Sequence, residues 1–324
     1  MHILITGSSG HLGMALSIAL KNSPHQIVGI DLQPSKYTHH IGSISNKAFV
    51  QKCMQGIDVV LHTATLHKPH IVTHSQQDFI DTNITGTLNL LTAAQKERVQ
   101  SFIFTSTTST FGDAMKSENS AVWVTEQLVP QPKNIYGVTK IAAENLCQLF
   151  HRNHQLPCII LRTSRFFSEA DDNKILRASY LDANIKANEL LYRRVDIQDV
   201  VDAHLLAIEK AANIGFGRFI ISGTTPFKPT DLTGLFTRAP KVLEQYFPEY
   251  ATIYATNDWN FFPSIGRVYV NELAQQVLGW QPKYDFQWVL DCLKNKKDFR
   301  SPLAVAVGIR GYHEETFEDG PYPV

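Results

Sequence analysis

The sequence predicts an α/β protein built on a doubly wound parallel sheet, with a smaller lobe towards the C-terminus. Short apolar runs alternate with helical patterns from the first residues, and this order is typical of a parallel sheet with helices on both faces. The apolar runs show little polar alternation, as expected of strands buried on both sides. Beyond Arg162 the alternation breaks, and prolines and aromatic residues gather between Pro226 and Pro263.

The first thirty-one residues predict a strand, a glycine-rich turn, a helix and a second strand that ends in an acidic residue. Residues 2–6 form an apolar run, Gly7, Gly10 and Gly13 follow it, and a second apolar run ends at Asp31. Such a turn lets a pyrophosphate approach bare backbone, and the helix start offers N–H groups to the phosphates. Asp31 stands where a carboxylate binds an adenosine ribose and repels a 2′-phosphate, which predicts NAD rather than NADP. The predicted contacts in the turn are Gly7, Ser9, Gly10, His11, Leu12 and Gly13.

The remaining elements continue this alternation. Further strands are expected over residues 26–31, 58–64, 101–106, 158–162 and 218–221, and helices over residues 77–98, 136–153, 199–211, 231–246, 270–278 and 286–297. We expect a Rossmann-type NAD-binding domain over residues 1–165 and a mainly substrate-binding lobe, interleaved with the sheet, over residues 166–300. The aromatic tail over residues 301–324 is expected to pack on the body or on a partner subunit.

Composition argues against nucleic-acid and membrane partners. The thirty basic and thirty acidic side chains cancel, so no strong field attracts a polyanion. No apolar run reaches the roughly 18–20 residues that span a bilayer. The four cysteines are scattered, which is typical of thiols in a reducing compartment. The sequence therefore predicts a cytoplasmic protein.

Tyr136 and Lys140 stand four residues apart, on one face of an expected helix. A tyrosine with a pKa of about 10 is a poor base at neutral pH, and a lysine beside it favours the phenolate. The strand before this helix ends in a run of hydroxyls over residues 105–109. One of these hydroxyls would hold a substrate oxygen while Tyr136 moves a proton, a pattern that predicts an enzyme.

Together these features resemble the extended short-chain dehydrogenase/reductase family, in its NAD-dependent epimerase/dehydratase group. The resemblance runs from residue 1 to about residue 295, and its motifs follow the family order. They are TGSSGHLG at residues 6–13, HTAT at residues 62–65, NITGT at residues 83–87, FTST at residues 104–107 with Phe111 and Gly112 beyond it, Thr125 with Glu126, Tyr136 with Lys140, and LGWQP at residues 278–282.

The resemblance implies roles for the matching residues. Tyr136 would be the general acid/base, Thr107 would orient the substrate, and Lys140 would hold the nicotinamide ribose and lower the pKa of Tyr136. The expected cofactor contacts outside the glycine turn are Asp31, Ser43, Ile44, Thr63, Ala64, Thr65, Asn83, Thr105, Tyr136 and Lys140. The expected substrate contacts are His67, Thr107, Thr108, Arg165 and Arg194.

Departures from the family pattern bear on the substrate. Thr108 and Ser109 replace the Asp-Glu pair of the dehydratases, which argues against water elimination. Arg165 stands where the family has asparagine, and only thirty-one residues separate Arg162 from Arg194, where related epimerases have a longer insertion. We therefore expect a compact site in which Arg165 binds a carboxylate or a single phosphate. The alternative is an ion pair between Arg165 and a nearby acid: Glu169, Asp171 or Asp172.

Four histidines lie within thirteen residues: His62, His67, His70 and His74. Pro69 disfavours a helix through them, and no thiol or nearby carboxylate completes a ligand set, so we expect no metal site. His67 is expected instead at the mouth of the active site or, as the stronger alternative, in a solvated loop.

The leading hypothesis is an NAD-dependent epimerase that transiently oxidises a carbohydrate alcohol, with a nucleotide sugar as substrate. The alternative on the same fold is a net dehydrogenase or reductase of a free sugar, a sugar acid or another small carbonyl compound. A non-catalytic NAD-binding protein is disfavoured because Thr107, Tyr136 and Lys140 are all present. We expect a homodimer with a small-molecule substrate and no nucleic-acid or membrane partner.

Overall fold

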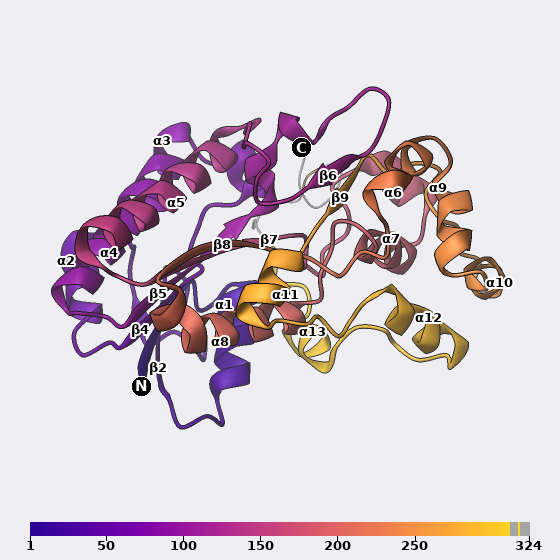
Figure 1. Cartoon of the computed structure of the whole chain (residues 1–324). Coiled ribbons are helices and arrows are strands. Elements are labelled where there is room, and N and C mark those ends of the chain that lie inside the picture. Colours follow the sequence, from indigo (N-terminus) through magenta and orange to yellow (C-terminus); the bar gives the residue numbers. More distant parts are fainter. Residues whose placement is uncertain (312–316, 318–324) are drawn as a thin grey trace. The chain divides into compact units, whose positions relative to one another are not determined.

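The structure, a computed structural model, describes residues 1–311 and residue 317, and the chain forms two compact units (Figure 1). The first unit comprises residues 1–112, 132–163 and 200–219, and the second comprises residues 113–131, 164–199 and those from 220 onward. The expected boundary at residue 165 would place residues 113–131 in the first unit and residues 200–219 in the second. In the structure, residues 113–131 belong to the second unit and residues 200–219 to the first. Of the predicted tail, residues 312–316 and 318–324 lie outside the described residues.

A seven-stranded sheet runs through the first unit. In spatial order its strands are β3 (His40–Ile41), β2 (Gln26–Asp31), β1 (His2–Thr6), β4 (Val59–His62), β5 (Ser101–Thr107), β7 (Cys158–Thr163) and β8 (Phe216–Ile221). Neighbouring strands from β3 to β7 pair in parallel. The chain order reverses at β1, which lies between β2 and β4, and open α/β sheets bind ligands at the carboxyl ends of the strands around such a point. The predicted doubly wound parallel sheet is confirmed.

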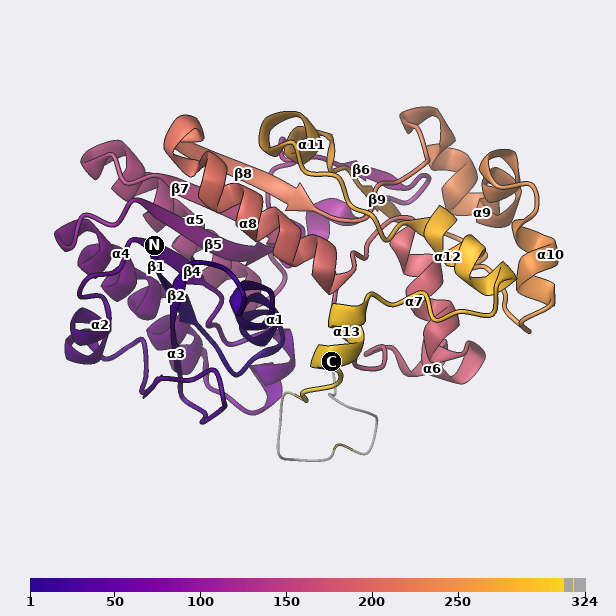
Figure 2. The ribbon, with the colours of Figure 1, turned by 90° about the horizontal axis from the view of Figure 1, so that it is seen from below.

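Helices cover both faces of this sheet. Figure 2 shows α1 (His11–Leu20) and α8 (Ile197–Ile214) on one face, and α2 (Lys47–Cys53), α4 (Gly86–Lys96) and α5 (Ile135–His154) on the other. The buried side chains of α4 and α5 pack on the apolar strands of the sheet in one hydrophobic core. This core packs α4 and the middle and end of α5 against the strands.

The helix expected over residues 77–98 forms, but it is not a regular α-helix throughout. The structure has α3 (Gln76–Phe79), a π-helical segment η2 (Ile80–Thr85) and then α4. A π-helical turn inserts an extra residue into the helix, and such turns occur frequently at functional sites. Here the turn contains Asn83, whose side chain is buried.

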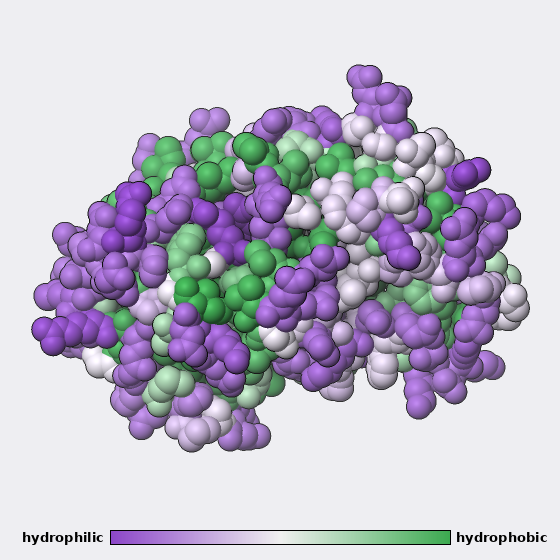
Figure 3. All heavy atoms as spheres, viewed as in Figure 1, coloured by the Kyte–Doolittle hydropathy of each residue, from purple (hydrophilic) through white to green (hydrophobic). Residues whose placement is uncertain are grey.

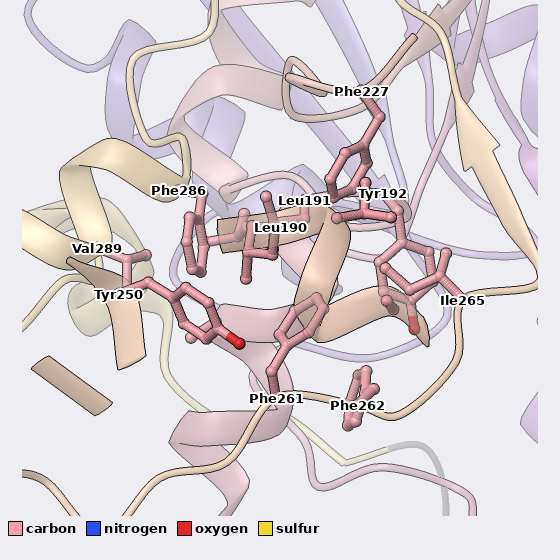
Figure 4. Close-up of a cluster of buried hydrophobic side chains, with 14 of the residues drawn as sticks. Leu190, Leu191, Tyr192, Phe227, Tyr250, Phe261, Phe262, Ile265, Phe286 and Val289 are labelled. Atoms are coloured by element: carbon pink, nitrogen blue, oxygen red, sulfur yellow. The ribbon is translucent and has the colours of Figure 1, made fainter. Parts of the chain in front are cut away.

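The second unit contains seven α-helices in its described part and a small parallel sheet. The helices are α6 (Lys174–Ser179), α7 (Asp182–Leu190), α9 (Leu232–Tyr246), α10 (Tyr250–Ala255), α11 (Glu272–Leu278), α12 (Phe286–Lys294) and α13 (Pro302–Val307), and the strands are β6 (Val122–Val124) and β9 (Arg267–Tyr269). Aromatic rings dominate its core (Figure 4). Tyr254, for example, meets Trp259 edge to face with ring centroids 5.5 Å apart. Aromatic residues between Pro226 and Pro263 therefore contribute to the interior of this unit, whereas the prolines of this segment are half-buried or exposed.

Hydrophilic side chains dominate the molecular face shown in Figure 3, with smaller hydrophobic patches between them. None of the helices within the described residues is long and apolar enough to cross a membrane.

Candidate active site

The glycine turn between β1 and α1 is packed so tightly that two of its glycines admit no side chain. Gly7 has a φ of +73°, and a Cβ there would lie 2.8 Å from the backbone N of Ala64. A Cβ on Gly13 would lie 2.0 Å from the carbonyl O of Gly7. A Cβ on Gly10 would have one neighbour within 4 Å among the described residues, the Gly7 carbonyl O at 3.4 Å. Gly10 therefore leaves the room that a pyrophosphate needs.

The start of α1 carries no side-chain cap and no acidic residue in its first turn, as far as the described residues go. The helices α2 and α5 differ, because Asn46 and Asn134 cap them. Ser9, His11 and Leu12 complete the turn at this uncapped end. The positive end of the helix dipole at this start of α1 fits a pyrophosphate anion.

Asp31 ends β2 with its carboxylate directed to the glycine turn. Its Oδ2 accepts a hydrogen bond from the backbone N of Ser9 at 2.9 Å, and its Oδ1 accepts one from the backbone N of Gln33 at 3.0 Å. Each carboxylate oxygen has capacity for a further donor. The side chain is therefore fixed, half-buried and still able to accept from ribose hydroxyls.

The other predicted cofactor residues of the first unit line the same edge of the sheet. Thr63 Oγ1 donates to the carbonyl O of Thr6 at 2.7 Å, and the backbone N of Ala64 donates to Thr6 Oγ1 at 3.1 Å. Ser43 follows β3, and the side chain of Ile44 beside it is buried. These contacts fix the backbone where an adenine and a pyrophosphate would lie.

Asn83 joins the loop after β4 to the catalytic helix. Its Oδ1 accepts from Thr65 Oγ1 at 2.8 Å and from the backbone N of Leu66 at 2.9 Å. Its Nδ2 donates to the carbonyl O of Leu66 and to Thr139 Oγ1, both within 3.1 Å. The side-chain amide of Asn83 thus accepts two hydrogen bonds and donates two. These bonds hold the loop after β4 to α5.

The three predicted catalytic residues come together where β5 ends. Tyr136 lies in the first turn of α5, which Asn134 caps, and its hydroxyl is hydrogen-bonded to the Thr107 side chain. Thr107 Oγ1 accepts from the backbone N of Ser109 at 3.1 Å. The hydroxyl proton of Thr107 is thus available to the Tyr136 oxygen. Thr108 follows directly and is buried.

Lys140 lies one helical turn beyond Tyr136 and is almost fully buried. Its Nζ donates to the carbonyl O of Thr105 at 2.6 Å and lies 4.1 Å from the centroid of the Phe104 ring. Thr105 is therefore the residue that holds the ammonium, and its own hydroxyl bonds to His204 Nε2 at 2.8 Å.

Burial dominates the electrostatics of this group. It raises the pKa of Tyr136 to about 12, and the hydrogen bond from Thr107 lowers that pKa only in part. Burial also lowers the pKa of Lys140 to about 7, which the negative charge of Glu144 partly opposes. Burial and the Thr107 hydrogen bond account for this shift of the Tyr136 pKa. The expectation that Lys140, together with a bound nicotinamide, lowers the tyrosine pKa stays a prediction.

Two supporting residues were not found from the sequence. The buried Glu144, a further turn along α5, accepts from Arg162 Nε at 2.9 Å and Nη2 at 2.7 Å, and from Ser106 Oγ at 2.6 Å. This joins α5 to β5 and β7 beneath Lys140. The spacing of four residues from Lys140 was the available signal for Glu144. No sequence signal points to His204, which lies 99 residues from Thr105 along the chain.

The described histidines form no metal site. Within residues 1–311 and 317, no group of three His, Cys, Asp or Glu side chains is placed to hold a metal ion. His67 lies against Tyr136, with ring centroids 5.9 Å apart. His62 is buried and bonds instead to Thr6 and Thr87.

Arg165 and Arg194 belong to the second unit, where carboxylates surround them. Arg165 forms ion pairs with Asp171, with Asp172 at 2.6 Å and with Glu189 at 3.1 Å. Arg194 Nε lies 2.8 Å from a Glu189 carboxylate oxygen. The fully buried Glu189 has its pKa lowered, because the attraction of the neighbouring arginines outweighs its burial. The ion-pair alternative stated for Arg165 is therefore present, with Asp171 and Asp172 as partners, and Glu189 is an added one.

Fold and site together define a dinucleotide-binding α/β protein with the threonine, tyrosine and lysine of an extended short-chain dehydrogenase/reductase. The sequence profile of the NAD dependent epimerase/dehydratase family matches residues 3–221, more than half of the chain. The chain belongs to this family.

Curated relatives match about half of the chain. The uncharacterized UDP-glucose epimerase YtcB of Bacillus subtilis is 28% identical over 185 residues, which cover 50% of this chain and 55% of the relative. The dTDP-D-glucose 4,6-dehydratase of Dictyostelium discoideum is 27% identical over 191 residues, 51% of this chain and 44% of the relative. The chain thus spans about half the length of these relatives.

Solved structures match the fold over most of the chain. The UDP-glucose 4-epimerase of Thermotoga maritima, solved with UDP-glucose, has a TM-score of 0.62 at 23% identity and covers 91% of this chain and 99% of its own. A short-chain dehydrogenase/reductase superfamily protein of Agrobacterium tumefaciens, solved with bound NAD, has a TM-score of 0.63 at 20% identity, with coverages of 91% and 98%. At these identities the likeness concerns the fold.

Proposed function

We propose that the protein is an NAD-dependent epimerase that acts on a nucleotide sugar by transient oxidation of a carbohydrate alcohol. The observation that carries the proposal is the buried Tyr136, hydrogen-bonded to Thr107 and followed one turn later by Lys140, at the sheet edge that also bears the glycine turn. Membership of the family and the epimerase activity named for its relative in Bacillus subtilis support this function.

The chain's own residues fit NAD. The glycine turn and the start of α1 would take the pyrophosphate, Asp31 the adenosine ribose, and Lys140 the nicotinamide ribose. When bound, NAD supplies the acceptor and donor of the hydride and a positively charged ring that favours the Tyr136 phenolate. The carboxylate of Asp31 repels a 2′-phosphate, so NAD is the proposed form.

Tyr136 would move the proton. Its phenolate takes the proton from the substrate hydroxyl while the carbon of that alcohol loses its hydride, and its hydroxyl returns the proton when the hydride comes back to the opposite face of the carbon. Thr107 donates to the Tyr136 oxygen and so stabilises the phenolate. Lys140, held by the Thr105 carbonyl O, brings a positive charge to a dry site in which charges interact strongly.

A net dehydrogenase of a sugar acid receives less support. That alternative relied on Arg165 as a free guanidinium for a carboxylate, and three acidic side chains neutralise Arg165. A new anion would have to compete with them. A purely NAD-binding role is equally disfavoured, since Thr107, Tyr136 and Lys140 are all retained.

The test is a panel of UDP-glucose, UDP-glucuronic acid and UDP-N-acetylglucosamine, set against the free sugars and sugar acids. Purified protein with NAD is incubated with each compound, products are separated by chromatography, and NADH is followed by absorbance. We expect the C4 epimer of one UDP-sugar to form without accumulation of NADH. Steady NADH production from a free sugar or sugar acid, with no epimer, would contradict the proposal.

We further propose a cytoplasmic homodimer. Large apolar side chains lie exposed on α4 (Leu88) and α5 (Val138 and Leu149), and a second copy of the chain would cover such a surface. Sedimentation equilibrium should give twice the chain mass, and Val138→Glu should shift the protein towards the monomer. A monomeric wild-type protein at micromolar concentration would contradict the dimer.

A further inference from the structure

His204 is a buried imidazole on the face of the sheet opposite to α5, and the proposed proton transfer does not use it (Figure 2). It belongs to α8. Its Nε2 lies 2.8 Å from the Thr105 hydroxyl, and its Nδ1 lies 2.8 Å from the carbonyl O of Val200. Both ring nitrogens are thus hydrogen-bonded, and one of them is bonded to the residue that holds Lys140.

The partners of His204 decide which ring nitrogen carries the proton. A backbone carbonyl O only accepts, so the bond to Val200 requires a proton on Nδ1. Burial lowers the pKa of His204 to about 4, so the ring is neutral at working pH and its Nε2 has a free lone pair. Nε2 therefore accepts, and the Thr105 hydroxyl donates to it. This bond directs the Thr105 side chain towards α8.

The end of β5 is bonded on both faces of the sheet, because successive side chains of a strand point to opposite faces. Thr105 bonds to His204 on α8, whereas the next residue, Ser106, donates to Glu144 on α5 at 2.6 Å. The carbonyl O of Thr105 accepts from Lys140 Nζ at 2.6 Å. Thr105 therefore connects His204, on one face of the sheet, to Lys140, on the other.

Lys140 depends on this carbonyl O more than an exposed lysine would. It is 2% exposed, and burial opposes its positive charge. A buried ammonium is stabilised by the acceptors fixed around it, so a shift of the acceptor moves the ammonium or weakens its bond. The placement of Lys140 relative to Tyr136 thus depends on the position of Thr105.

We propose that His204 is a positioning residue, which fixes the carbonyl O that holds Lys140 by accepting a hydrogen bond from the Thr105 hydroxyl. The effect on the reaction rests on the function proposed above, in which Lys140 holds the nicotinamide ribose and supports the Tyr136 phenolate. His204 then acts on NAD binding and on the chemical step, and not on binding of the sugar. No covalent bond forms or breaks at His204.

The direction of the hydrogen bond can be measured without turnover. Long-range ¹H–¹⁵N correlation NMR of the labelled wild-type protein reports which imidazole nitrogen carries the proton, and the signals of His204 are those lost in His204→Gln. We expect the proton on Nδ1. A proton on Nε2 would overturn the proposal, because Nε2 could then not accept from Thr105.

Four variants test the consequence for the site. His204→Phe keeps a planar ring and removes both hydrogen bonds, His204→Gln keeps an oxygen that can accept from Thr105, and Thr105→Val removes the hydroxyl and keeps the carbonyl. Val201→Ala is the matched control, because it removes buried methyl groups from the same helix and lowers stability without changing either bond. For each variant, thermal unfolding reports the fold, calorimetry the Kd for NAD, and steady-state kinetics the kcat and the KM for the UDP-sugar.

We expect His204→Phe and Thr105→Val each to weaken NAD binding about tenfold, the loss of roughly one hydrogen bond. Each should lower kcat about ten- to hundredfold, because Lys140 is displaced, and leave the KM for the UDP-sugar within about twofold. The double variant should be no worse than either single variant, since both remove the same bond. His204→Gln should recover part of the loss, and Val201→Ala should retain the NAD affinity and kcat of the wild type.

Wild-type NAD affinity in both His204→Phe and Thr105→Val, or losses that add in the double variant, would overturn the role of His204. An equal loss in Val201→Ala would do the same, because loosening of α8 alone would then explain the effect. If the wild type binds NAD and epimerises no UDP-sugar, the proposed function fails, and the tautomer and the NAD affinities still decide on His204.

Discussion

Tyr136 is assigned the proton transfer, and its surroundings both oppose and assist that role. Burial raises its pKa to about 12, while the Thr107 hydroxyl favours the phenolate. Removing only the hydroxyl keeps the ring packed, so we expect Tyr136→Phe to lower kcat by about a hundred- to ten-thousandfold and to leave NAD affinity within about twofold. Steady-state kinetics and an NAD titration measure the two effects. Turnover near that of the wild type would remove Tyr136 from the mechanism.

Asp31 is proposed to decide between NAD and NADP by charge. Its carboxylate, fixed by the backbone N–H groups of Ser9 and Gln33, lies where a 2′-phosphate would be repelled. We expect calorimetry to give a markedly lower Kd for NAD than for NADP. Asp31→Ala should reduce the difference between the two Kd values, because NAD loses a hydrogen-bond acceptor and NADP is no longer repelled. Equal affinities in the wild-type protein would refute the assignment.

His204 predicts a loss of stability in acid. Its Nδ1 bonds to the carbonyl O of Val200 and its Nε2 accepts from Thr105, so the ring is buried and neutral, and burial lowers its pKa to about 4. The unfolded chain takes up this proton at its ordinary pKa of about 6.5, so protons favour the unfolded state as the pH falls from there towards 4. The free energy of unfolding should therefore decrease over this range.

Urea unfolding at several pH values from neutral to pH 4 measures this effect. His204→Gln should flatten the decrease relative to wild type, and His154→Gln, at the exposed end of α5, should leave it unchanged. An identical pH dependence in wild type and His204→Gln would show that His204 does not contribute.

At the scale of elements, two glycines of the turn between β1 and α1 have different roles. We expect the fold to require Gly13 and cofactor binding to require Gly10. A Cβ on Gly13 would clash with the Gly7 backbone at 2.0 Å, whereas a Cβ on Gly10 meets the Gly7 carbonyl O at 3.4 Å. We expect Gly13→Ala to lower the unfolding temperature strongly. Gly10→Ala should fold normally and bind NAD at least about tenfold more weakly, because its methyl group occupies the pyrophosphate approach.

Gly266→Ala is the control for these substitutions, because no described atom outside its chain neighbours lies within 4 Å of its added Cβ. Thermal unfolding and NAD titration of the three variants check the prediction. If Gly10→Ala bound NAD as tightly as wild type, the pyrophosphate would have to bind elsewhere.

The parts of the site that lie within one short stretch of sequence could be predicted from its motif. The spacing of Tyr136 and Lys140 places both on one face of α5, and the glycines define the turn. Asn83 was predicted as a contact, but the π-helical turn that aims it at Leu66 and Thr139 has no local sequence signature. The partners of Arg165 were predicted in part, since Asp171 and Asp172 are close in sequence, whereas Glu189 comes from the end of α7.

At the scale of the whole molecule, the parallel sheet was predictable because its strands are apolar on both faces. The two-residue β3 and the three-residue β6 and β9 are too short to show a period, and they form through pairing with distant strands. The helices α2, α6, α7, α10 and α13 are also short and were not predicted. Assignment of residues 113–131 and 200–219 to the two units depends on long-range packing, which a linear reading of the sequence does not contain.

The central claim, that a hydride leaves the sugar and returns to the same carbon, is tested most directly with a substrate labelled at that carbon. UDP-hexose carrying deuterium at C4 is incubated with the NAD-loaded protein, and product and cofactor are analysed by mass spectrometry. We predict the C4 epimer with the deuterium retained at C4 and no labelled NADH released into solution. Deuterium recovered in free NADH, together with a 4-keto product and no epimer, would contradict the claim.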